Sequence, residues 1–436
     1  MNTLSAPPGC LPARGCSVVG MSAVAILNRR DEDCWESTLI GGALWYYCIP
    51  VRNCANLPQL REDDLCVEIP AFRSEGDEQP SPLRSHCRTV VLAGRNLTRQ
   101  HLRKPLPVAG NEILVYGEPY ALISQLARDR KMGDALKGKA ILGPLLDPRE
   151  YRTPPVSTRQ AGWAAVMTSL GCQKRCAYCS HGVNSSYLYG QQFSRRSRPW
   201  QAVREELAQF VTNGITQFVL LADQFLSPDP EKNCDLLSLA THWDSQKLGQ
   251  PILVFTVSPR DVLSNQSLFE ALAHSFQLHP KLSIDSFDNG TLQLLDLDFD
   301  AATALEALRF FASLQLHFRI NYLFLRPGVT LENLREEFSF FHALDGLVAY
   351  LNPYEKLMLA FDLFSGSLRV VSGTPVEKKL GVRARYEGEF PPELLKAVIG
   401  IQGAMEQELH NLPNLRAADP LRAVLNAGLK EITVPR

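Results

Sequence analysis

Short apolar runs alternate with amphipathic stretches along the middle of the chain. Residues 199–212 show helical spacing, with Val203, Leu207 and Phe210 on one face and Asn213-Gly214 as the stop signal. Repeated strand–helix units predict a parallel sheet with right-handed crossovers. About six units predict a partial (β/α)6-type barrel over residues 161–376. We expect its strands at residues 164–168, 218–222, 252–256, 282–284, 319–324 and 356–360.

The region before this barrel has a different pattern. Its apolar runs predict a Rossmann-like α/β domain over residues 1–137, with about four strands. A polar, Pro- and Ser-rich stretch at residues 74–85 predicts an exposed loop, and the Pro-rich residues 138–160 predict a linker. We expect the four strands at residues 23–27, 65–69, 89–94 and 112–118.

The end of the chain has a helical stripe of apolar residues over residues 391–412. We therefore expect a C-terminal helical extension over residues 377–436. Its simplest role is a helix that caps the open side of the barrel, and partner binding is the alternative.

Composition narrows the function classes. The formal net charge of −1 over 436 residues gives no electrostatic case for nucleic acid or an anionic membrane. No apolar run approaches the roughly 18 residues that span a bilayer, and the N-terminus has no continuous apolar core of the kind a signal peptide needs. With eleven cysteines and no export signal, we expect a cytoplasmic protein whose cysteines are free or bound to metal.

Three cysteines stand close together in one loop. Cys172, Cys176 and Cys179 have the spacing C-x3-C-x2-C. Three thiolates at this spacing can ligate three irons of one 4Fe–4S cluster and leave the fourth iron open. Zinc is the weaker alternative, since His181 and Cys234 make a poor second pair. A disulfide would leave one thiol over.

Seven further cysteines precede this loop and include no tight pair: Cys10, Cys16, Cys34, Cys48, Cys54, Cys66 and Cys87. The simplest interpretation is that most are small buried apolar residues. An auxiliary cluster that begins at Cys48 and Cys54 is the alternative.

The cysteine spacing, with Tyr178 just before the last cysteine, resembles the cluster loop of the radical S-adenosylmethionine (SAM) superfamily. The resemblance implies that the open iron binds the amino and carboxylate groups of SAM. It also implies that an electron, from a donor such as flavodoxin or ferredoxin, breaks a carbon–sulfur bond to give a 5′-deoxyadenosyl radical.

The layout resembles the cobalamin-binding subclass, in which a Rossmann-like domain precedes the barrel. The signature D-x-H-x-x-G is absent, and one strand–helix unit is missing near residues 74–86, so bound cobalamin and a scaffold without cofactor both stay open. Segments that resemble the subclass are Tyr116-Gly117-Glu118, Thr168 to Cys172, Arg196 to Pro199, Ala222 to Phe225, Arg260-Asp261, Asp285-Ser286, Arg326 to Thr330 and Ser372 to Pro375.

Several residues at strand ends are candidates for SAM binding. The resemblance places the backbone of Tyr178 beside the adenine. Asp223 can accept from an amine or a ribose hydroxyl, or cap a helix. Arg260 can pair with the SAM carboxylate through its planar fork, or with Asp261 at the surface.

Five other residues complete the candidate set. Asp285 and Ser286 end a strand and can reach the ribose. Pro327 and Gly328 let the backbone approach a flat base, or form an ordinary turn. Cys234 is a candidate hydrogen-atom donor, with a buried structural thiol as its alternative.

A basic run lies beside the cysteine loop. Arg195, Arg196 and Arg198 could bind an acidic substrate, shield the charge of a cluster, or form a solvated face.

These patterns predict a radical SAM enzyme that acts on a C–H bond of a specialised metabolite or a peptide. If cobalamin binds, cobalamin-dependent C-methylation is the reaction we expect first. If it does not bind, we expect radical oxidation, rearrangement or peptide epimerisation. A non-catalytic iron–sulfur or zinc protein is the rival outside catalysis. We expect no nucleic acid and no membrane among the partners, and the near-zero charge argues against a methylthiotransferase acting on transfer RNA.

Overall fold

The computed structural model divides the chain into two compact units. The first comprises residues 1–171 and 184–199, and the second residues 172–183 and 200–436. The residues whose structure is described are 24–28, 51–54, 65–69, 87–93, 101–102, 105–152, 163–179, 187–190, 194–227, 229, 233–245, 249–326, 329–366, 374–380, 392–410 and 419–433.

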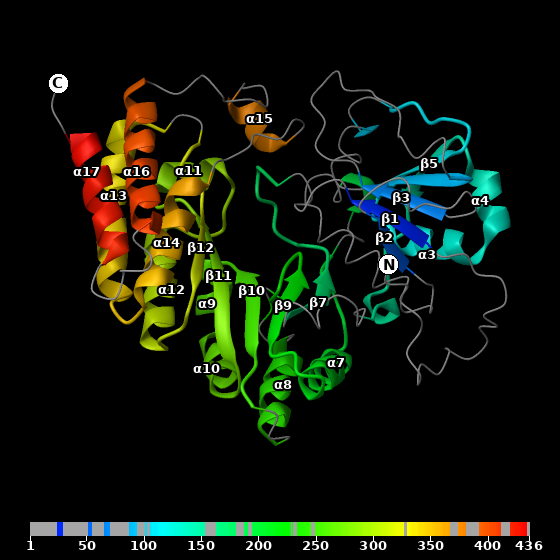
Figure 1. The fold of residues 1–436 in the computed structure, drawn as a ribbon, viewed down its shortest axis with the longest axis horizontal. Helices are drawn as coiled ribbons and strands as arrows, with labels where there is room; N and C mark the ends of the chain where they lie inside the picture. The colour runs from blue at the N-terminus through cyan, green and yellow to red at the C-terminus, as the bar shows by residue number, and fades with distance from the viewer. Residues whose placement is uncertain are drawn as a thin grey trace. The chain divides into compact units, whose positions relative to one another are not determined.

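The first unit contains a sheet whose described strand pairs are all parallel, with the order β2-β1-β3-β4-β5-β6 (Figure 1). Val67, Val90 and Ile113 on its central strands are fully buried. Such a sheet confirms the Rossmann-like α/β prediction. Its strands are β1 (Val24–Asn28), β2 (Val51–Cys54), β3 (Leu65–Ile69), β4 (Thr89–Ala93), β5 (Glu112–Gly117) and β6 (Lys139–Gly143). Helices α3 (Tyr120–Arg128) and α4 (Arg130–Leu136) connect the last two, and the short helix η4 (Pro148–Glu150) follows them.

The prediction of about four strands was wrong, because the described part of this sheet contains six strands. Strand β2 has the sequence VRNC, which carries no apolar run. Strand β6 occupies the first residues of the segment that we expected to be a linker, and it pairs with β5 in parallel. With β2 and β6, the sheet has more strands than the sequence predicted. The apparent loss of a strand, which counted against a cobalamin-type domain, therefore no longer applies. The loop expected at residues 74–85 lies outside the described residues.

A disulfide joins two cysteines that we expected to be free or bound to metal. Cys66 in β3 and Cys87 before β4 lie with their Cα atoms 6.2 Å apart and form this bond. Because β3 and β4 are neighbours in the sheet, the fold brings together two residues that are 21 positions apart in sequence. Spacing alone gave no signal of this pair. Cys48, one start of the proposed auxiliary cluster, lies outside the described residues, as does the side chain of Cys54.

The second sheet has the order β12-β11-β10-β9-β7-β8. Strands β9 to β12 pair in parallel, and the two-residue β8 pairs with β7 in antiparallel fashion. The strands are β7 (Trp163–Leu170), β8 (Arg196–Ser197), β9 (Gln217–Ala222), β10 (Ile252–Val257), β11 (Gln277–Asp285) and β12 (Arg319–Tyr322). The first five strands expected for the barrel are confirmed, and so is the α/β fold class.

Helices connect these strands, as Figure 1 shows in green to yellow. Several begin at polar residues whose side chains accept from the first turn, as Asp300 does from Thr303 and Thr330 from Asn333. They are α7 (Trp200–Thr212), α8 (Cys234–Ser245), α9 (Pro259–Leu263), α10 (Gln266–Ser275), α11 (Asn289–Leu294), α12 (Ala301–Ser313) and α13 (Leu331–Leu347). The helix expected over residues 199–212 is confirmed.

The prediction of a sixth strand at residues 356–360 was wrong, because these residues lie inside helix α14 (Pro353–Ser365). Asn352 caps this helix, Pro353 opens it, and Glu355 completes a capping box. A short apolar run bounded in this way is helical, although its composition fits either structure.

The C-terminal extension is helical, as expected. Helices α16 (Pro392–His410) and α17 (Pro420–Thr433) contact each other and α14, and α17 also contacts α13. Figure 1 shows α13, α14, α16 and α17 side by side. A Cβ atom at Gly428 would lie 2.6 Å from the ring of Phe338, so α17 needs glycine there to approach α13. The short helix α15 (Pro375–Leu380) precedes this group. Within the described residues, no helix is long and apolar enough to cross a membrane.

Candidate functional site

The cysteine loop follows strand β7 directly. Gly171 makes the turn with φ of 81°, and a Cβ atom there would lie 2.3 Å from the carbonyl oxygen of Ser194. The three cysteines form no disulfide and have intermediate exposure. Burial raises the pKa of Cys172 to about 11 and that of Cys176 to about 12, and the charge of Cys179 adds to both shifts.

These three thiols fit the ligands of an iron–sulfur cluster. Burial and the charge of neighbouring groups make the thiolates of Cys172 and Cys176 unfavourable, and bound iron ions would supply the missing positive charge. Within the described residues, no three His, Cys, Asp or Glu side chains gather closely enough to hold a single metal ion. In a 4Fe–4S cluster each protein thiolate binds a different iron, so its ligands stand apart.

The backbone of the loop is held at Ala177. Its N–H donates to the carbonyl of Leu295 at 2.7 Å, and its own carbonyl accepts from the N–H of Val376 at 3.1 Å. Ala177, Leu295, Leu323 and Val376 form a buried apolar cluster, against which Tyr178 packs. Segments after α11 and at the start of α15 therefore fix the middle of the cysteine loop.

The first part of the loop is held by the ends of β9 and β10. The N–H of Gln173 donates to the Oε1 atom of Gln224 at 2.9 Å. The ammonium of Lys174 lies 3.0 Å from the carboxylate of Asp261 and donates to Ser258. Sequence reasoning missed both as anchors, although Gln224 follows Asp223 and Lys174 lies between Cys172 and Cys176.

The last part of the loop is held by Asp285 at the end of β11. The hydroxyl of Tyr178 donates to this carboxylate at 2.9 Å, and the side-chain amide of Asn321 donates to its other oxygen at 3.0 Å. Asp285 has φ of 64° and is 1% exposed. Burial raises its pKa to about 6, although both hydrogen bonds lower it. Burial also raises the pKa of Tyr178 well above its usual value.

Ser286, the next residue, lies in a buried polar network. Its hydroxyl donates to Glu337 on α13 at 2.7 Å. Glu337 also receives a hydrogen bond from Arg326 at 2.9 Å, and both side chains are almost fully buried. Glu337 was not a sequence candidate. A carboxylate on the same helical face as Leu334, Phe338 and Phe341 is the signal that could have found it.

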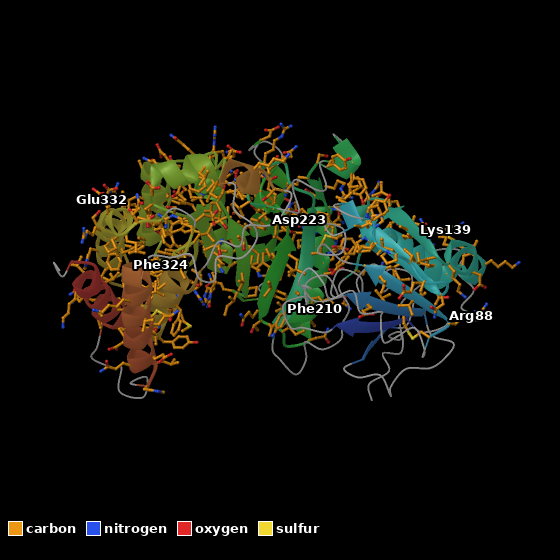
Figure 2. All side chains as sticks on the ribbon, turned by 90° about the horizontal axis from the view of Figure 1, so that it is seen from above. Arg88, Lys139, Phe210, Asp223, Phe324 and Glu332 are labelled. Carbon is orange, nitrogen blue, oxygen red and sulfur yellow. A yellow bond between two sulfur atoms is a disulfide. The ribbon has the colours of Figure 1, made fainter. Side chains whose placement is uncertain are left out.

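Some of the remaining predicted site residues lie within the described part of the structure, and others lie outside it. Asp223 directly follows β9 (Figure 2) and acts on Cys172 through its charge. Arg260 is exposed and donates to the carbonyl oxygen of Asp298 at 3.0 Å. Asp261 pairs with Lys174 and not with Arg260. Cys234 begins α8, but its side chain lies outside the described part of the structure, as do Pro327 and Gly328.

The sequence profile of the Radical SAM superfamily matches residues 166–341. This stretch contains the three-cysteine loop and the strand ends that hold it. Residues 166–341 form a radical SAM domain. No curated protein sequence matches the chain.

Solved structures of similar fold contain radical SAM domains too. The cobalamin-dependent SAM radical enzyme OxsB, with aqua-cobalamin and SAM bound, matches with a TM-score of 0.63 and 12% identity, over 92% of this chain and 72% of that one. The radical SAM methyltransferase TsrM from Kitasatospora setae, with cobalamin and a 4Fe–4S cluster bound, matches with a TM-score of 0.56 and 14% identity. That match covers 75% of this chain and 74% of TsrM. Both likenesses concern the fold.

The sheet that precedes the radical SAM domain suits a cobalamin-type domain in topology. Its order β2-β1-β3-β4-β5 is that of flavodoxin-like folds, whose ligands bind at the carboxyl ends of the strands. The segments that follow β1 to β4 lie outside the described residues.

The ends of β5 and β6 are occupied by protein. The hydroxyl of Tyr189 accepts from the N–H of Glu118 at 2.7 Å and donates to the carbonyl of Gly143 at 2.6 Å. Arg196 pairs with the carboxylate of Glu118 and donates to the carbonyl of Leu146 at 2.5 Å. These contacts belong to the first unit and tie Tyr189 and Arg196 to its sheet.

Two arginines of the basic run are therefore structural. Arg196 closes the end of β5, and Arg198 is buried, donates to the carbonyl of Met167 at 3.0 Å and stacks over Tyr151. Arg195 donates to Ser197 at 2.5 Å. The interpretation of this run as a solvated face is wrong for Arg198, because its side chain is buried.

Proposed function

We propose that this chain is a radical SAM enzyme with one 4Fe–4S cluster on Cys172, Cys176 and Cys179. When bound, the cluster supplies an electron, delivered by an external donor such as flavodoxin or ferredoxin, for reductive cleavage of SAM to a 5′-deoxyadenosyl radical. The observation that supports this most is the three-cysteine loop, which follows β7 within the matched domain and is held by the ends of β9, β10 and β11.

The protein's own residues bind and orient SAM in this proposal. Asp223 accepts from the amino group or a ribose hydroxyl, and Asp285 with Ser286 fixes the strand end that faces the ribose. Tyr178 borders the adenine, held by Asp285. Pro327 and Gly328 let the backbone approach the base. Arg260 reaches the SAM carboxylate only if its guanidinium leaves the carbonyl of Asp298.

The proposed reaction begins with removal of a hydrogen atom from a C–H bond of a small molecule or a peptide. Cys234 at the start of α8 is the candidate that returns a hydrogen atom if the outcome is epimerisation. Oxidation and rearrangement are the other outcomes without cobalamin. A cytoplasmic location suits all of them, since the cluster is sensitive to oxygen.

Cobalamin-dependent C-methylation is the candidate that the first sheet favours. The expected loss of a strand weighed against cobalamin, and the described sheet has the full flavodoxin-like order. OxsB and TsrM, whose folds resemble this chain, are cobalamin enzymes. The carboxyl ends of β1 and β3 flank the point where the strand order reverses, so they would hold the cofactor.

The cluster is tested by anaerobic reconstitution with iron and sulfide. We expect about four irons per chain and release of 5′-deoxyadenosine when SAM and a reductant are added, measured by mass spectrometry. The variant with all three loop cysteines changed to Ala should bind no cluster and release none. A Cys66→Ala, Cys87→Ala variant is the control that should keep both. Product from the triple variant would refute the assignment.

Cobalamin is tested by its visible spectrum after production with the vitamin available. A stoichiometric corrin would favour methyl transfer. Its absence, with 5′-deoxyadenosine still formed, would leave a cobalamin-free radical enzyme. No heat on titration of the reconstituted protein with SAM would favour the non-catalytic iron–sulfur alternative.

A further inference from the structure

We propose that Glu337 is a positioning residue of the SAM site. From helix α13 it fixes the turn that follows β11, and this turn aims Asp285 at Tyr178 in the cysteine loop. The inference rests on the proposed function for its catalytic consequence, but its structural core can be tested without SAM.

Three donors from two strand ends converge on one oxygen of Glu337. The hydroxyl of Ser286 donates to Oε1 at 2.7 Å, the N–H of Phe287 at 3.2 Å, and the guanidinium of Arg326 at 2.9 Å. The carboxylate is 1% exposed. A buried carboxylate without these donors would be costly, so the ion keeps its donors in place.

The turn that Glu337 holds has an unfavourable backbone. Asp285 adopts φ of 64°, in the left-handed region, which costs a residue with a Cβ atom roughly 1–2 kcal/mol. The strand register between β11 and β12 also shifts between Ser283 and Asp285. Such a conformation persists where its surroundings determine it. The two hydrogen bonds from Ser286 and Phe287 to Glu337 follow this residue directly.

Arg326 completes the arrangement at the exit of β12. Its Nε atom donates to Thr291 at 3.0 Å, and another nitrogen donates to the carbonyl of Leu323 at 3.3 Å. The planar guanidinium thus joins α11, the end of β12 and Glu337 with fixed directions. Leu323 belongs to the apolar cluster under the cysteine loop.

One chain of contacts then leads from α13 to the loop. Glu337 holds Ser286, Ser286 follows Asp285, and Asp285 accepts from the hydroxyl of Tyr178 at 2.9 Å. If the turn relaxes, the carboxylate of Asp285 leaves Tyr178, and the residue before the third cysteine loses its orientation.

The same helix offers a matched control. Asp345 is also buried on α13, and its carboxylate pairs with Arg422 on α17 at 2.8 Å. This pair joins two helices, and within the described part of the structure neither side chain bonds to the turn after β11. Glu337→Gln and Asp345→Asn each make one buried carboxylate neutral, so both should destabilise the fold.

The first readout needs no cofactor. Fluorotyrosine is incorporated at position 178 of the cluster-free protein and its fluorine NMR resonance is recorded. We expect Glu337→Gln to shift or broaden this resonance and Asp345→Asn to leave it unchanged. An unchanged resonance in folded Glu337→Gln would overturn the proposal. If that variant does not fold, Ser286→Ala keeps the ion pair and should move the resonance in the same way.

The second readout uses the reconstituted enzyme. We expect Glu337→Gln to slow 5′-deoxyadenosine release or raise the KM for SAM by roughly tenfold or more, since small misplacements cost up to a hundredfold. It should also alter the change that SAM makes in the electron paramagnetic resonance spectrum of the reduced cluster. If Asp345→Asn changed 5′-deoxyadenosine release and the spectrum as much as Glu337→Gln does, Glu337 would be a structural residue and not a positioning residue. A wild-type protein without SAM cleavage would refute the proposed function and leave the fluorine result to decide the inference.

Discussion

The hydroxyl of Tyr178 donates to the carboxylate of Asp285 at 2.9 Å, across 107 residues of sequence. One partner precedes the last cysteine of the loop and the other ends β11. The contact fastens the end of the cysteine loop to the sheet, so the loop's geometry depends on a buried carboxylate as well as on its own sequence.

Replacing Tyr178 with Phe should leave the cluster bound and slow SAM cleavage. The ring still packs on the apolar cluster around Ala177, but Asp285 loses a donor, which should cost about 1–3 kcal/mol of folding free energy. Iron content and 5′-deoxyadenosine release measure the two effects. Tyr350→Phe is the control, because its hydroxyl donates only to a backbone carbonyl, that of Leu316 at 2.7 Å. Equal rates in the two variants would contradict the prediction.

The stability of the cluster-free protein should carry a pH-dependent contribution from Asp285. Burial raises its pKa from 3.8 to about 6, so the folded state binds more protons than the unfolded state between these values. This contribution is present below about pH 4 and is lost as the pH rises through about 6, by about 3 kcal/mol for a shift of about two units.

Urea unfolding of wild type and Asp285→Asn at pH 4 and pH 7 isolates this contribution. Other groups titrate equally in both proteins, so the stability of the variant relative to wild type should rise with pH. A difference that stays constant would mean that Asp285 has an ordinary pKa.

Lys174→Met should shorten the lifetime of the cluster in the presence of a chelator. The change leaves the nearly buried Asp261 without its ammonium partner, at a cost of about 1–3 kcal/mol for a partly exposed pair. Loss of absorbance after addition of the chelator measures the rate. Adding Asp261→Asn should recover part of the loss, since the two changes remove one interaction. Strictly additive effects would show that the pair does not hold the loop.

Asn352→Ala should lower the free energy of unfolding by about 1 kcal/mol, because Asn352 caps α14 and accepts from the N–H of Glu355 at 3.0 Å. Urea unfolding measures the change, and Thr330→Ala at the start of α13 should have a similar effect. A neutral result for Asn352→Ala alone would mean that this cap does not stabilise α14.

The fold was predictable where apolar runs and stop signals agreed. Residues 199–212 combined a helical face with Asn213-Gly214, and α7 ends at Thr212. Residues 356–360 misled because an apolar run of five fits a strand or a helix, and the decisive cap at Asn352 lay outside the run. Strand β2, with the polar sequence VRNC, owes its conformation to its neighbour β1 and gave no local signal.

The site was predictable where local spacing carries the chemistry. Cys172, Cys176 and Cys179 stand in one loop, so their separation is visible in the sequence. Glu337 is 51 residues from Ser286, and only the packing of α13 against the sheet brings them together. Its place on an apolar helical face was the single local sign.

The bond between Cys66 and Cys87 closes the chain between them into a covalent ring. A protease cut anywhere in that ring would leave the two halves of the chain covalently joined. Lengthening the ring would cost little, since doubling a loop adds only about 0.6 kcal/mol of closure entropy. A reporter peptide or an affinity tag inserted between the end of β3 and Cys87 would therefore leave β3 and β4 covalently joined.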